Sequence, residues 1–576
     1  MDLVVPISEI QYVGIGPEEP VALCMDTAEI AHCGAGCQSG PCLLNGAVEA
    51  PSAKPASPNP IPGTFQVIGD SGVPVMHAAL LPNGHVVFID KVENYTKLIL
   101  PNGRFAYAAE WDPLTAQVTA LSMKTNAFCS AGTFLADGTL LSIGGNGPLE
   151  SIDPTVGDGY KSLRTLRRSI NDRSFDGQSF AEAGNLSSAR WYASAQILSD
   201  GRIFVASGSL NGLDPTVAAN NNPTYEILSQ TGTPLTQSTS LDILLRNQPY
   251  YMYPFIHLLR TGDLFVFTSK SSELWSPVIK SALLVYPDLP GEYRTYPNTG
   301  TSVLLPLSSD NHWDPEVIIC GGGAYQDLAS PTDPSCGRIA PLAENPKWEM
   351  DAMPEGRAMV EGVLLPDGTI VFLNGCNQGA QGFLLATKPT LDALLYDPNA
   401  PLGQRWTTLA RSSIPRLYHS VALLLLDGTI MIAGSNPVEQ PVLKATADYP
   451  FTTEFRVEIY TPPYLSGENA NKRPINVTLS ETRLKANGSY FSLSFKAPSG
   501  ANQLKVCLYH GGFVTHSLHM GQRMMFLDTI GWETGQSSQI VNVTMPPSNN
   551  VAPPGPYVLY VLVDGIPSVG QFVMVS

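Results

Sequence analysis

Leu135-Ala136-Asp137-Gly138-Thr139 is one copy of a short motif that recurs along this chain and decides its fold. Each copy places a glycine turn between two apolar segments. Asn-Gly and Asp-Gly pairs tolerate the positive φ angles of tight hairpin turns, so each copy predicts two antiparallel strands. The other copies are Leu81-Pro82-Asn83-Gly84-His85, Leu198-Ser199-Asp200-Gly201-Arg202, Arg260-Thr261-Gly262-Asp263, Leu365-Pro366-Asp367-Gly368-Thr369 and Leu426-Asp427-Gly428-Thr429.

The spacing of these copies predicts the architecture. Their turn glycines recur at nearly even intervals, except that the gap between Gly262 and Gly368 is close to twice as long as the others. Near the middle of that gap, Asp314-Pro315-Glu316 and the apolar run after it supply the missing copy. Seven units at this kelch-like spacing predict an all-β fold, a seven-bladed β-propeller over residues 63–465. A β-sandwich with many hairpins is the alternative, but it seldom keeps so steady a period.

The chain on either side of the repeats has a different character. Residues 466–576 contain short alternating strands, such as 490–495 and 557–562, and predict one immunoglobulin-like sandwich. Residues 43–62 are rich in Pro, Ala and Ser and predict an extended linker. Residues 1–42 hold four of the nine cysteines and resemble the end of a hevein-type chitin-binding module, so we expect a truncated remnant that does not bind chitin.

Composition narrows the classes of protein. With 14% charged and 43% hydrophobic residues, the chain can bury a large core, and 51 Gly and 49 Pro favour short strands and loops. Its net charge of −17 repels phosphate backbones, so nucleic acid is not an expected partner. No apolar run is long enough to span a membrane.

Several features favour secretion. Four cysteines crowd the N-terminal part, 1–42, and glycosylation sequons occur at Asn94, Asn185, Asn476, Asn487 and Asn542. The start, Met1-Asp2-Leu3, has neither the basic nor the apolar region of a signal peptide, so we expect that such a peptide has been removed.

A position nine places before the turn glycine carries unusual side chains. It is Cys129 in one unit, Tyr192 in the next and His419, preceded by Tyr418, in the last. If this position lies beside the propeller axis, the three groups converge, and such soft and borderline donors suit copper. The same count also gives Tyr253 and Met359, so the offset alone does not select ligands. Buried packing between blades is the competing interpretation.

Local motifs around these positions resemble those of the copper radical oxidases, the family of galactose oxidase and glyoxal oxidase. The resemblance covers about residues 64–576, with the motifs in the family's order. They are Asn126-Ala127-Phe128-Cys129-Ser130, Arg190-Trp191-Tyr192-Ala193-Ser194, Arg416-Leu417-Tyr418-His419-Ser420 and Gly512-Phe513-Val514-Thr515-His516-Ser517.

The resemblance implies a role for each motif residue. Tyr192 is expected to be joined through its ring to the sulfur of Cys129, in a thioether that holds a stable radical. Tyr192 (equatorial), Tyr418 (axial), His419 and His516 are expected to bind one copper ion, with Tyr418 taking the substrate's hydroxyl proton. His312, His510 and His519 fall outside the motifs and are not expected to be ligands.

Looser matches suggest further site residues. Trp191 could shield the radical or simply belong to the core, and Phe383 falls where the family has an aromatic wall. Tyr325-Gln326 resembles a substrate-side pair of the family, while Arg294 and Arg357 could anchor substrate oxygens or form ion pairs between blades.

Cys320 and Cys336, which flank a Pro-rich loop, are the expected disulfide of the propeller.

Three functions follow as hypotheses. The first is a glyoxal oxidase that converts small aldehydes, as hydrates, to carboxylic acids with dioxygen as oxidant and hydrogen peroxide as product. The second is an alcohol or galactose-type oxidase. It is disfavoured because Ser207-Gly208-Ser209-Leu210-Asn211 lacks the stacking tryptophan of galactose oxidase, while 219–226 is similar to glyoxal oxidase. The third is a non-catalytic kelch propeller that binds carbohydrate or protein. We expect a monomer, with peroxide-consuming enzymes as plausible partners.

Overall fold

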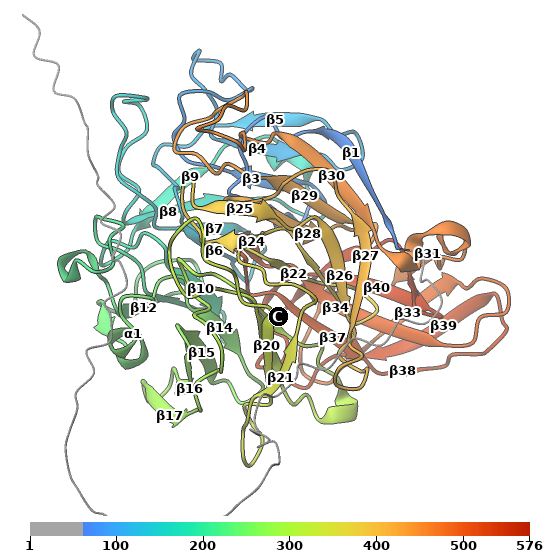
Figure 1. Ribbon diagram of the computed structural model, residues 1–576. Coiled ribbons are helices and arrows are strands. Elements are labelled where there is room, and N and C mark those ends of the chain that lie inside the picture. The colour runs from blue at the N-terminus through green and yellow to red at the C-terminus, as the bar shows by residue number, and fades with distance from the viewer. Residues whose placement is uncertain (1–61) are drawn as a thin grey trace, which may run out of the picture. The chain divides into compact units, whose positions relative to one another are not determined.

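The computed structural model describes residues 62–576. Seven groups of four strands form antiparallel sheets within this range (Figure 1). The first four groups are β2 (His77–Leu80), β3 (Val86–Ile89), β4 (Ala108–Trp111), β5 (Val118–Leu121); β6 (Ala131–Phe134), β7 (Leu140–Ile143), β8 (Ser162–Leu166), β9 (Ala181–Asn185); β10 (Ser194–Ile197), β11 (Ile203–Ala206), β12 (Thr224–Leu228), β13 (Thr239–Ser240); and β14 (Phe255–Leu258), β15 (Leu264–Thr268), β16 (Ser271–Ser276), β17 (Ser281–Val285).

The last of the seven groups is closed by a strand from the start of the described chain. The remaining groups are β18 (Thr301–Leu304), β19 (Val317–Cys320), β20 (Ser335–Ile339), β21 (Glu349–Ala352); β22 (Glu361–Leu364), β23 (Ile370–Leu373), β26 (Asp392–Tyr396), β27 (Trp406–Arg411); and β28 (Ser420–Leu424), β29 (Ile430–Gly434), β30 (Arg456–Thr461), β1 (Thr64–Asp70). A hairpin of β24 (Cys376–Gly379) and β25 (Ala386–Pro389) is inserted in the sixth group, and the α-helix in the described range, α1, spans Asp242–Arg246.

The first strands of successive groups line a common centre. β2 lies against β28, β28 against β22, β22 against β18, β14 against β10 and β10 against β6. The residues of these inner strands are buried, and their apolar side chains contribute to the core. The predicted all-β class is confirmed, and the arrangement is that of a β-propeller.

The predicted turns are confirmed at the six motif glycines. Gly84, Gly138, Gly201, Gly262, Gly368 and Gly428 all have φ between 81° and 96°. The copy expected near Asp314 differs, because the segment between β18 and β19 is a longer loop. Leu307 in that loop exchanges backbone hydrogen bonds with Met524 and Phe526 of the C-terminal domain (3.0 and 2.9 Å), so docking of this domain replaces the tight turn.

The C-terminal domain consists of two sheets. One contains β31 (Ile475–Leu479), β33 (Tyr490–Lys496), β39 (Ser538–Thr544) and β38 (Thr529–Ile530), and the other β32 (Arg483–Leu484), β42 (Gln571–Val575), β40 (Gly555–Val563), β34 (Leu504–His510), β37 (Arg523–Leu527) and β41 (Ile566–Pro567). It contacts the propeller at the motif turns: Tyr560 Oη donates to Leu425 O (2.7 Å) and Asn550 Nδ2 to Arg260 O (3.0 Å).

One hairpin of this domain enters the propeller. β35 (Phe513–Thr515) and β36 (Leu518–Met520) extend the first sheet, with β35 antiparallel to β2 and Thr515 opposite His77. β36 also lies against β6, β10, β14 and β18, so the hairpin occupies the centre of the ring. Its tip therefore reaches the ends of the inner strands that lie opposite the motif turns.

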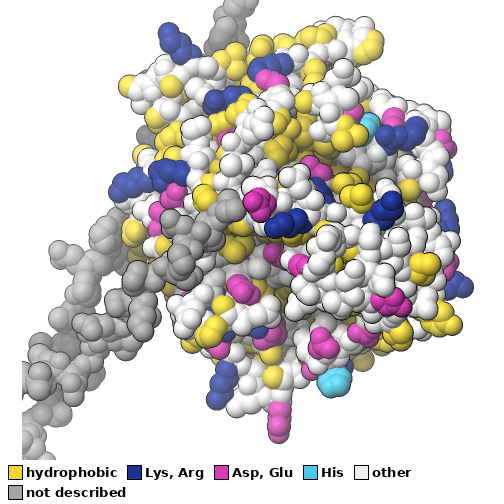
Figure 2. Space-filling view, turned by 90° about the vertical axis from the view of Figure 1, so that its right-hand side faces the viewer, with side chains coloured by type: hydrophobic (Ala, Val, Ile, Leu, Met, Phe, Trp, Pro, Cys, Tyr) yellow, Lys and Arg dark blue, Asp and Glu magenta, His cyan; other side chains and the backbone are white. Residues whose placement is uncertain are grey.

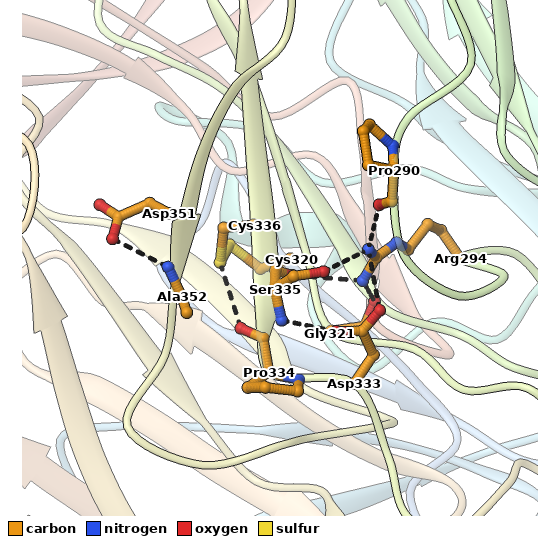
Figure 3. The surroundings of a disulfide bond; sticks show 10 residues. All are labelled: Pro290, Arg294, Cys320, Gly321, Asp333, Pro334, Ser335, Cys336, Asp351 and Ala352. Carbon is orange, nitrogen blue, oxygen red and sulfur yellow. Dashed lines mark hydrogen bonds and ion pairs between the residues drawn. A yellow bond between two sulfur atoms is a disulfide. The ribbon is translucent and has the colours of Figure 1, made fainter. Parts of the chain in front are cut away.

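Other predictions concern cysteines and the N-terminus. The disulfide between Cys320 and Cys336 is confirmed and joins opposed residues of β19 and β20 (Figure 3). The expected remnant at 1–42 and nearly all of the linker at 43–62 lie outside the described residues. Within 62–576, no helix has the length and apolarity needed to cross a bilayer. On the face shown in Figure 2, basic and acidic side chains are interspersed, without a continuous basic patch.

Candidate metal centre

The nine-place offset found in the sequence is a common backbone conformation. Cys129, Tyr192, Tyr253, Met359 and His419 all have left-handed φ angles, between 49° and 68°, directly before an inner strand. Residues other than glycine rarely adopt this backbone conformation, which costs of order 1 kcal/mol or more per residue. Tyr192 N–H donates to Cys129 O (3.1 Å) and Tyr253 N–H to Tyr192 O (3.0 Å), so equivalent residues of neighbouring sheets are joined. The shared conformation brings their side chains to one end of the central channel.

His516 reaches the same place from the C-terminal domain. It stands with Ser517 at the tip of the β35–β36 hairpin, and both residues have positive φ (48° and 67°). Positive φ at both central residues is the signature of a two-residue type I′ turn, which matches the twist of the strands. The tight tip places the imidazole at the end of the channel instead of in a loop.

Five predicted residues meet at this end of the channel. The phenol oxygens of Tyr192 and Tyr418 are 2.8 Å apart. Cys129 Sγ lies 3.2 Å from His516 Nε2 and 3.9 Å from His419 Nε2. The potential ligand atoms of Cys129, His419 and His516 all lie within 4.8 Å of one another, and all five side chains are buried.

Burial controls the protonation of this cluster. It raises the pKa values of the Tyr192 and Tyr418 phenols and the Cys129 thiol well above their usual ranges, and neighbouring Cys129 raises that of Tyr192 further. Burial also lowers the pKa values of His419 and His516 well below the usual range of imidazole. The enclosed donors are therefore neutral, and a bound cation would compensate the charge of a phenolate. Two imidazole nitrogens, two phenol oxygens and a thiol fit copper by donor type.

Aromatic rings enclose the cluster. Trp191 packs against Tyr192 with ring centroids 5.1 Å apart, and Phe383 lies 5.6 Å from Tyr418 and 5.7 Å from His419. Phe128 lies between Trp191 (5.2 Å) and Phe383 (6.3 Å). The predicted shield and wall positions, Trp191 and Phe383, thus lie at the cluster.

The other looser matches have different surroundings. Tyr325 is 65% exposed and Gln326 is exposed beside it. Arg294 is fully buried and donates to Gly321 O and Ser335 Oγ while pairing with Asp333 at 3.0 Å (Figure 3).

Arg357 is likewise fully buried. It donates to Asp392 O (2.8 Å) and pairs with Glu355 at 3.2 Å. Both guanidinium groups thus contact backbone carbonyls and carboxylates of the protein itself. Two of the three histidines outside the motifs also have protein partners: His510 Nδ1 contacts Pro556 O (2.7 Å) and His519 Nε2 contacts Glu361 (2.6 Å), while His312 is exposed.

The sequence did not reveal several neighbours of the cluster. Tyr296 packs on Tyr192 at 4.3 Å, and Met76 Sδ accepts from Cys129 N–H (3.3 Å). Lys91 Nζ is buried 5.8 Å from the ring centroids of both Phe128 and Phe383 and pairs with Glu93 at 2.5 Å. Tyr296, Met76 and Lys91 lie in none of the sequence motifs, so only the folded structure shows that they are close to the cluster. Tyr253, which shares the offset, packs on His516 at 4.8 Å.

Comparison with known proteins identifies the fold and the family of this chain. In a solved structure described as a novel fungal alcohol oxidase with catalytic diversity, in complex with copper, the fold matches with a TM-score of 0.68 at 19% identity, over 89% of this chain and 100% of that one. The family model for the glyoxal oxidase N-terminus matches residues 76–464, and that for the galactose oxidase-like early set domain matches 473–575. The chain belongs to the glyoxal oxidase family.

Named relatives are similar over most of their length. An aldehyde oxidase GLOX of Vitis pseudoreticulata is 33% identical over 89% of this chain and 97% of its own. An aldehyde oxidase GLOX1 of Arabidopsis thaliana is 31% identical over 89% of this chain and 85% of its own. A galactose oxidase of Gibberella zeae is 24% identical over 82% of this chain and 65% of its own.

Proposed function

We propose that this protein, a copper radical oxidase by family, oxidises small aldehydes as their hydrates to carboxylic acids and reduces dioxygen to hydrogen peroxide. The carrying observation is the enclosed group of two phenols, two imidazoles and one thiol, drawn from four separate segments. The names of the aldehyde oxidase relatives support aldehydes as the substrate class. The reaction balances as one aldehyde hydrate and one dioxygen giving one carboxylic acid and one hydrogen peroxide.

Tyr192, Tyr418, His419 and His516 would hold the copper ion, and Cys129 would be joined to the Tyr192 ring as a thioether. Bound copper would accept one electron and the thioether-linked phenol another, which together are the two electrons of the oxidation. Tyr418, as a phenolate, takes the hydroxyl proton of the substrate. With the thioether formed, the ring of Tyr192 would supply the group that accepts the hydrogen atom of the substrate carbon. Trp191, Phe128 and Phe383 exclude water from these steps.

Copper and the thioether are tested together. Purified protein is loaded with copper, oxidised mildly, and examined for metal content, absorption spectrum and the mass of the peptides that contain Cys129 and Tyr192. We expect one copper per chain, a radical absorption band, and a cross-linked peptide pair lighter by two hydrogens. Cys129→Ser is the matched control: it should bind copper but show neither the cross-link nor the stable radical. Uncross-linked wild-type peptides after copper loading and oxidation would contradict the proposed cofactor.

The substrate class is tested by peroxide release. Glyoxal and methylglyoxal are compared with primary alcohols and galactose, because a hydrated aldehyde and a primary alcohol present the same CH–OH unit. We expect turnover of the aldehydes. Fast oxidation of galactose without turnover of either aldehyde would favour an alcohol oxidase instead.

We also propose that the protein is a secreted glycoprotein and a monomer. All five sequon asparagines are exposed, so each can accept a glycan without unfolding. Expression in a secreting eukaryotic host, followed by enzymatic removal of N-glycans, should lower the mass. Light scattering should give the mass of one chain.

A further inference from the structure

A line of buried polar side chains leads to His516 on the side of its Nδ1 atom, away from the donor cluster. His77 Nε2 lies 3.1 Å from the carbonyl oxygen of Ala127, and His77 Nδ1 lies 2.6 Å from Thr515 Oγ1. Thr515 Oγ1 in turn lies 2.6 Å from His516 Nδ1. His77 and Thr515 are opposed residues of β2 and β35, and both are completely inaccessible to solvent. The line therefore connects the first propeller sheet to the tip of the inserted hairpin.

The direction of each hydrogen bond in this line can be assigned. A carbonyl oxygen only accepts, so His77 Nε2 carries the hydrogen that points to Ala127. His77 is completely buried and both of its ring nitrogens face uncharged partners, so the ring is neutral and its Nδ1 is an acceptor. The hydroxyl of Thr515 must then donate to His77 Nδ1. This leaves the lone pairs of Thr515 Oγ1 facing His516, whose Nδ1 is the donor.

One competing arrangement is less favourable. Thr515 Oγ1 also lies 3.3 Å from Met76 O and could donate there. His77 Nδ1 would then have to donate to Thr515, and a neutral His77 would present a bare Nε2 to the Ala127 carbonyl at 3.1 Å. Two acceptors at that distance in a buried site repel each other, although Ala127 O also accepts from Ser130 N–H (3.0 Å).

We propose that His77 and Thr515 are positioning residues that fix the tautomer of His516, so that its Nδ1 carries the hydrogen and its Nε2 binds copper. The proposal rests on the proposed copper site. His516 Nε2 is the nitrogen that faces the cluster, 3.2 Å from Cys129 Sγ. A partner on the distant nitrogen of a metal-binding histidine orients the ring, and its loss typically lowers metal affinity about 10–100-fold.

The backbone already holds the hairpin without this line. β35 pairs with β2 and with β36, and Thr301 Oγ1 donates to Ser517 O (2.9 Å). Removing the Thr515 hydroxyl should therefore change the metal site more than the docking of the hairpin. This difference separates a positioning role from a purely structural one.

The test compares matched variants of the full chain. Thr515→Val removes the hydroxyl at similar volume, and Thr515→Ser retains it. His77→Leu removes both ring nitrogens, while the amide of His77→Gln can donate to Ala127 O and accept from Thr515. Copper affinity is measured by competition with a chelator, the Cu(II) EPR spectrum reports nitrogen coupling, and the thermal midpoint of the metal-free protein reports folding.

We expect Thr515→Val and His77→Leu each to weaken copper binding about 10–100-fold and to change the EPR spectrum. Thr515→Ser and His77→Gln should bind nearly as well as wild type. The two losses should not add in the double variant, because both interrupt one line. Equal affinities and spectra for Thr515→Val and Thr515→Ser would overturn the proposal, as would losses that only follow a fall in the metal-free thermal midpoint. Wild-type protein that binds no copper would instead overturn the proposed function.

Discussion

Tyr192 and Tyr253 share one backbone conformation in adjacent sheets, yet their phenols have different surroundings. The Tyr192 oxygen faces Tyr418 at 2.8 Å, whereas the Tyr253 hydroxyl donates to Ser130 O at 3.1 Å. Tyr253 is therefore engaged in a hydrogen bond away from the donor cluster. The left-handed backbone conformation points the side chain toward the channel. The identity of the side chain and its hydrogen-bond partner decide whether it joins the cluster.

Replacement of each tyrosine by phenylalanine tests this distinction. Tyr253→Phe should retain copper and the cross-link while losing about 1–2 kcal/mol of unfolding free energy, because Ser130 O loses its partner. Tyr192→Phe should lose the radical band and nearly all activity. Copper content, absorption spectrum and chemical denaturation of both variants are the measurements. A Tyr253→Phe variant without the radical band would show that Tyr253 belongs to the redox site.

The sequence could predict site residues only where a repeat or motif marked them. Cys129, Tyr192 and His419 share an offset from a turn glycine, and this regularity reflects their common φ angle. Lys91 and Tyr296 stand in loops of no fixed spacing, so nothing in the sequence links them to the site. Arg294 and Arg357 were ambiguous because a guanidinium group serves ion pairs and substrate oxygens equally well, and only burial decides between these roles.

At the scale of elements, the tip of the β35–β36 hairpin holds strain that can be relieved. Ser517 occupies the second central position of the turn with φ of 67°, where glycine is favoured. Ser517→Gly should raise the unfolding free energy by about 0.5–1 kcal/mol, whereas Ser517→Ala keeps the strain and should not. Chemical denaturation of the metal-free variants measures this difference. Equal stability of the glycine and alanine variants would contradict it.

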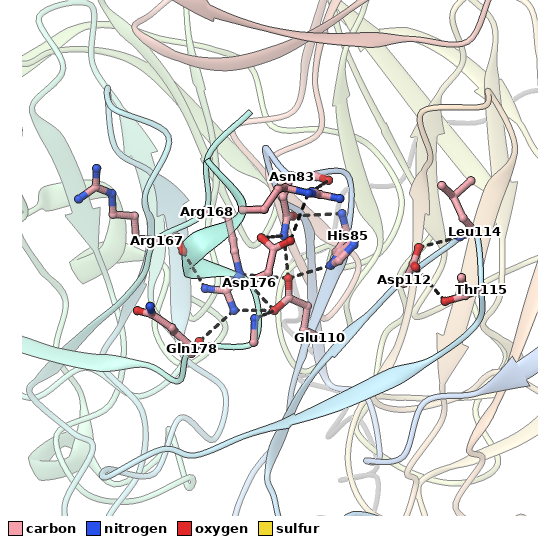
Figure 4. Close-up of polar contacts among 12 residues, drawn as sticks. Asn83, His85, Glu110, Asp112, Leu114, Thr115, Arg167, Arg168, Asp176 and Gln178 are labelled. Atoms are coloured by element: carbon pink, nitrogen blue, oxygen red, sulfur yellow. Dashed lines mark hydrogen bonds and ion pairs between the residues drawn. The ribbon is translucent and has the colours of Figure 1, made fainter. Parts of the chain in front are cut away.

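A buried ion pair ties the first two sheets together (Figure 4). Glu110 of β4 accepts three hydrogen bonds from Arg168, at 2.5, 3.0 and 3.1 Å, and others from Asn83 and His85. Although burial acts to raise it, these hydrogen bonds hold the pKa of the Glu110 carboxyl below its usual range. The carboxylate thus stays charged between the sheets and depends on its partners.

Loss of Arg168 should therefore be costly. Arg168→Met leaves the buried Glu110 charge without its main partner and should lower the unfolding free energy by about 3–5 kcal/mol. The exposed pair of Arg202 and Asp200 is the control, since Arg202→Met should cost less than about 1 kcal/mol. Urea denaturation of both variants measures the two losses. Similar losses would show that burial does not determine how much the Glu110–Arg168 pair contributes to the unfolding free energy.

The tight turns could be predicted because a glycine turn leaves a local signature. The irregular unit between Gly262 and Gly368 could not be predicted in detail, because its long loop is shaped by contact with Met524 and Phe526, distant in sequence. The insertion of the β35–β36 hairpin is likewise a tertiary event. That this segment supplies His516 could be expected only because residues 512–517 resemble a motif of the copper radical oxidases.

At the scale of the whole molecule, buried histidines make stability depend on pH. His257 of β14 contacts Ser302 Oγ at 2.8 Å, and burial lowers its pKa to about 3. Between pH 6.5 and 3 the unfolded chain binds a proton at this residue that the folded protein does not. Stability is therefore lost as pH falls, by about 2 kcal/mol for this residue between pH 7 and 5.

The variant His257→Gln isolates this contribution. Unfolding free energies of wild type and variant are measured at pH 7 and pH 5, and the wild type should lose about 2 kcal/mol more than the variant. Burial raises the pKa of Glu93 to about 7, so this residue changes stability with pH in the opposite direction. Its contribution is the same in wild type and variant and cancels in the difference between them. An equal loss in both proteins would show that His257 does not titrate on unfolding.

The hairpin that delivers His516 also sets an order in time. Cys129 and His516 are separated by 387 positions, and His516 follows all the propeller strands in the chain. A ribosome releases nearly the whole propeller before this imidazole exists. A polypeptide that stops before residue 516 therefore lacks a complete donor set.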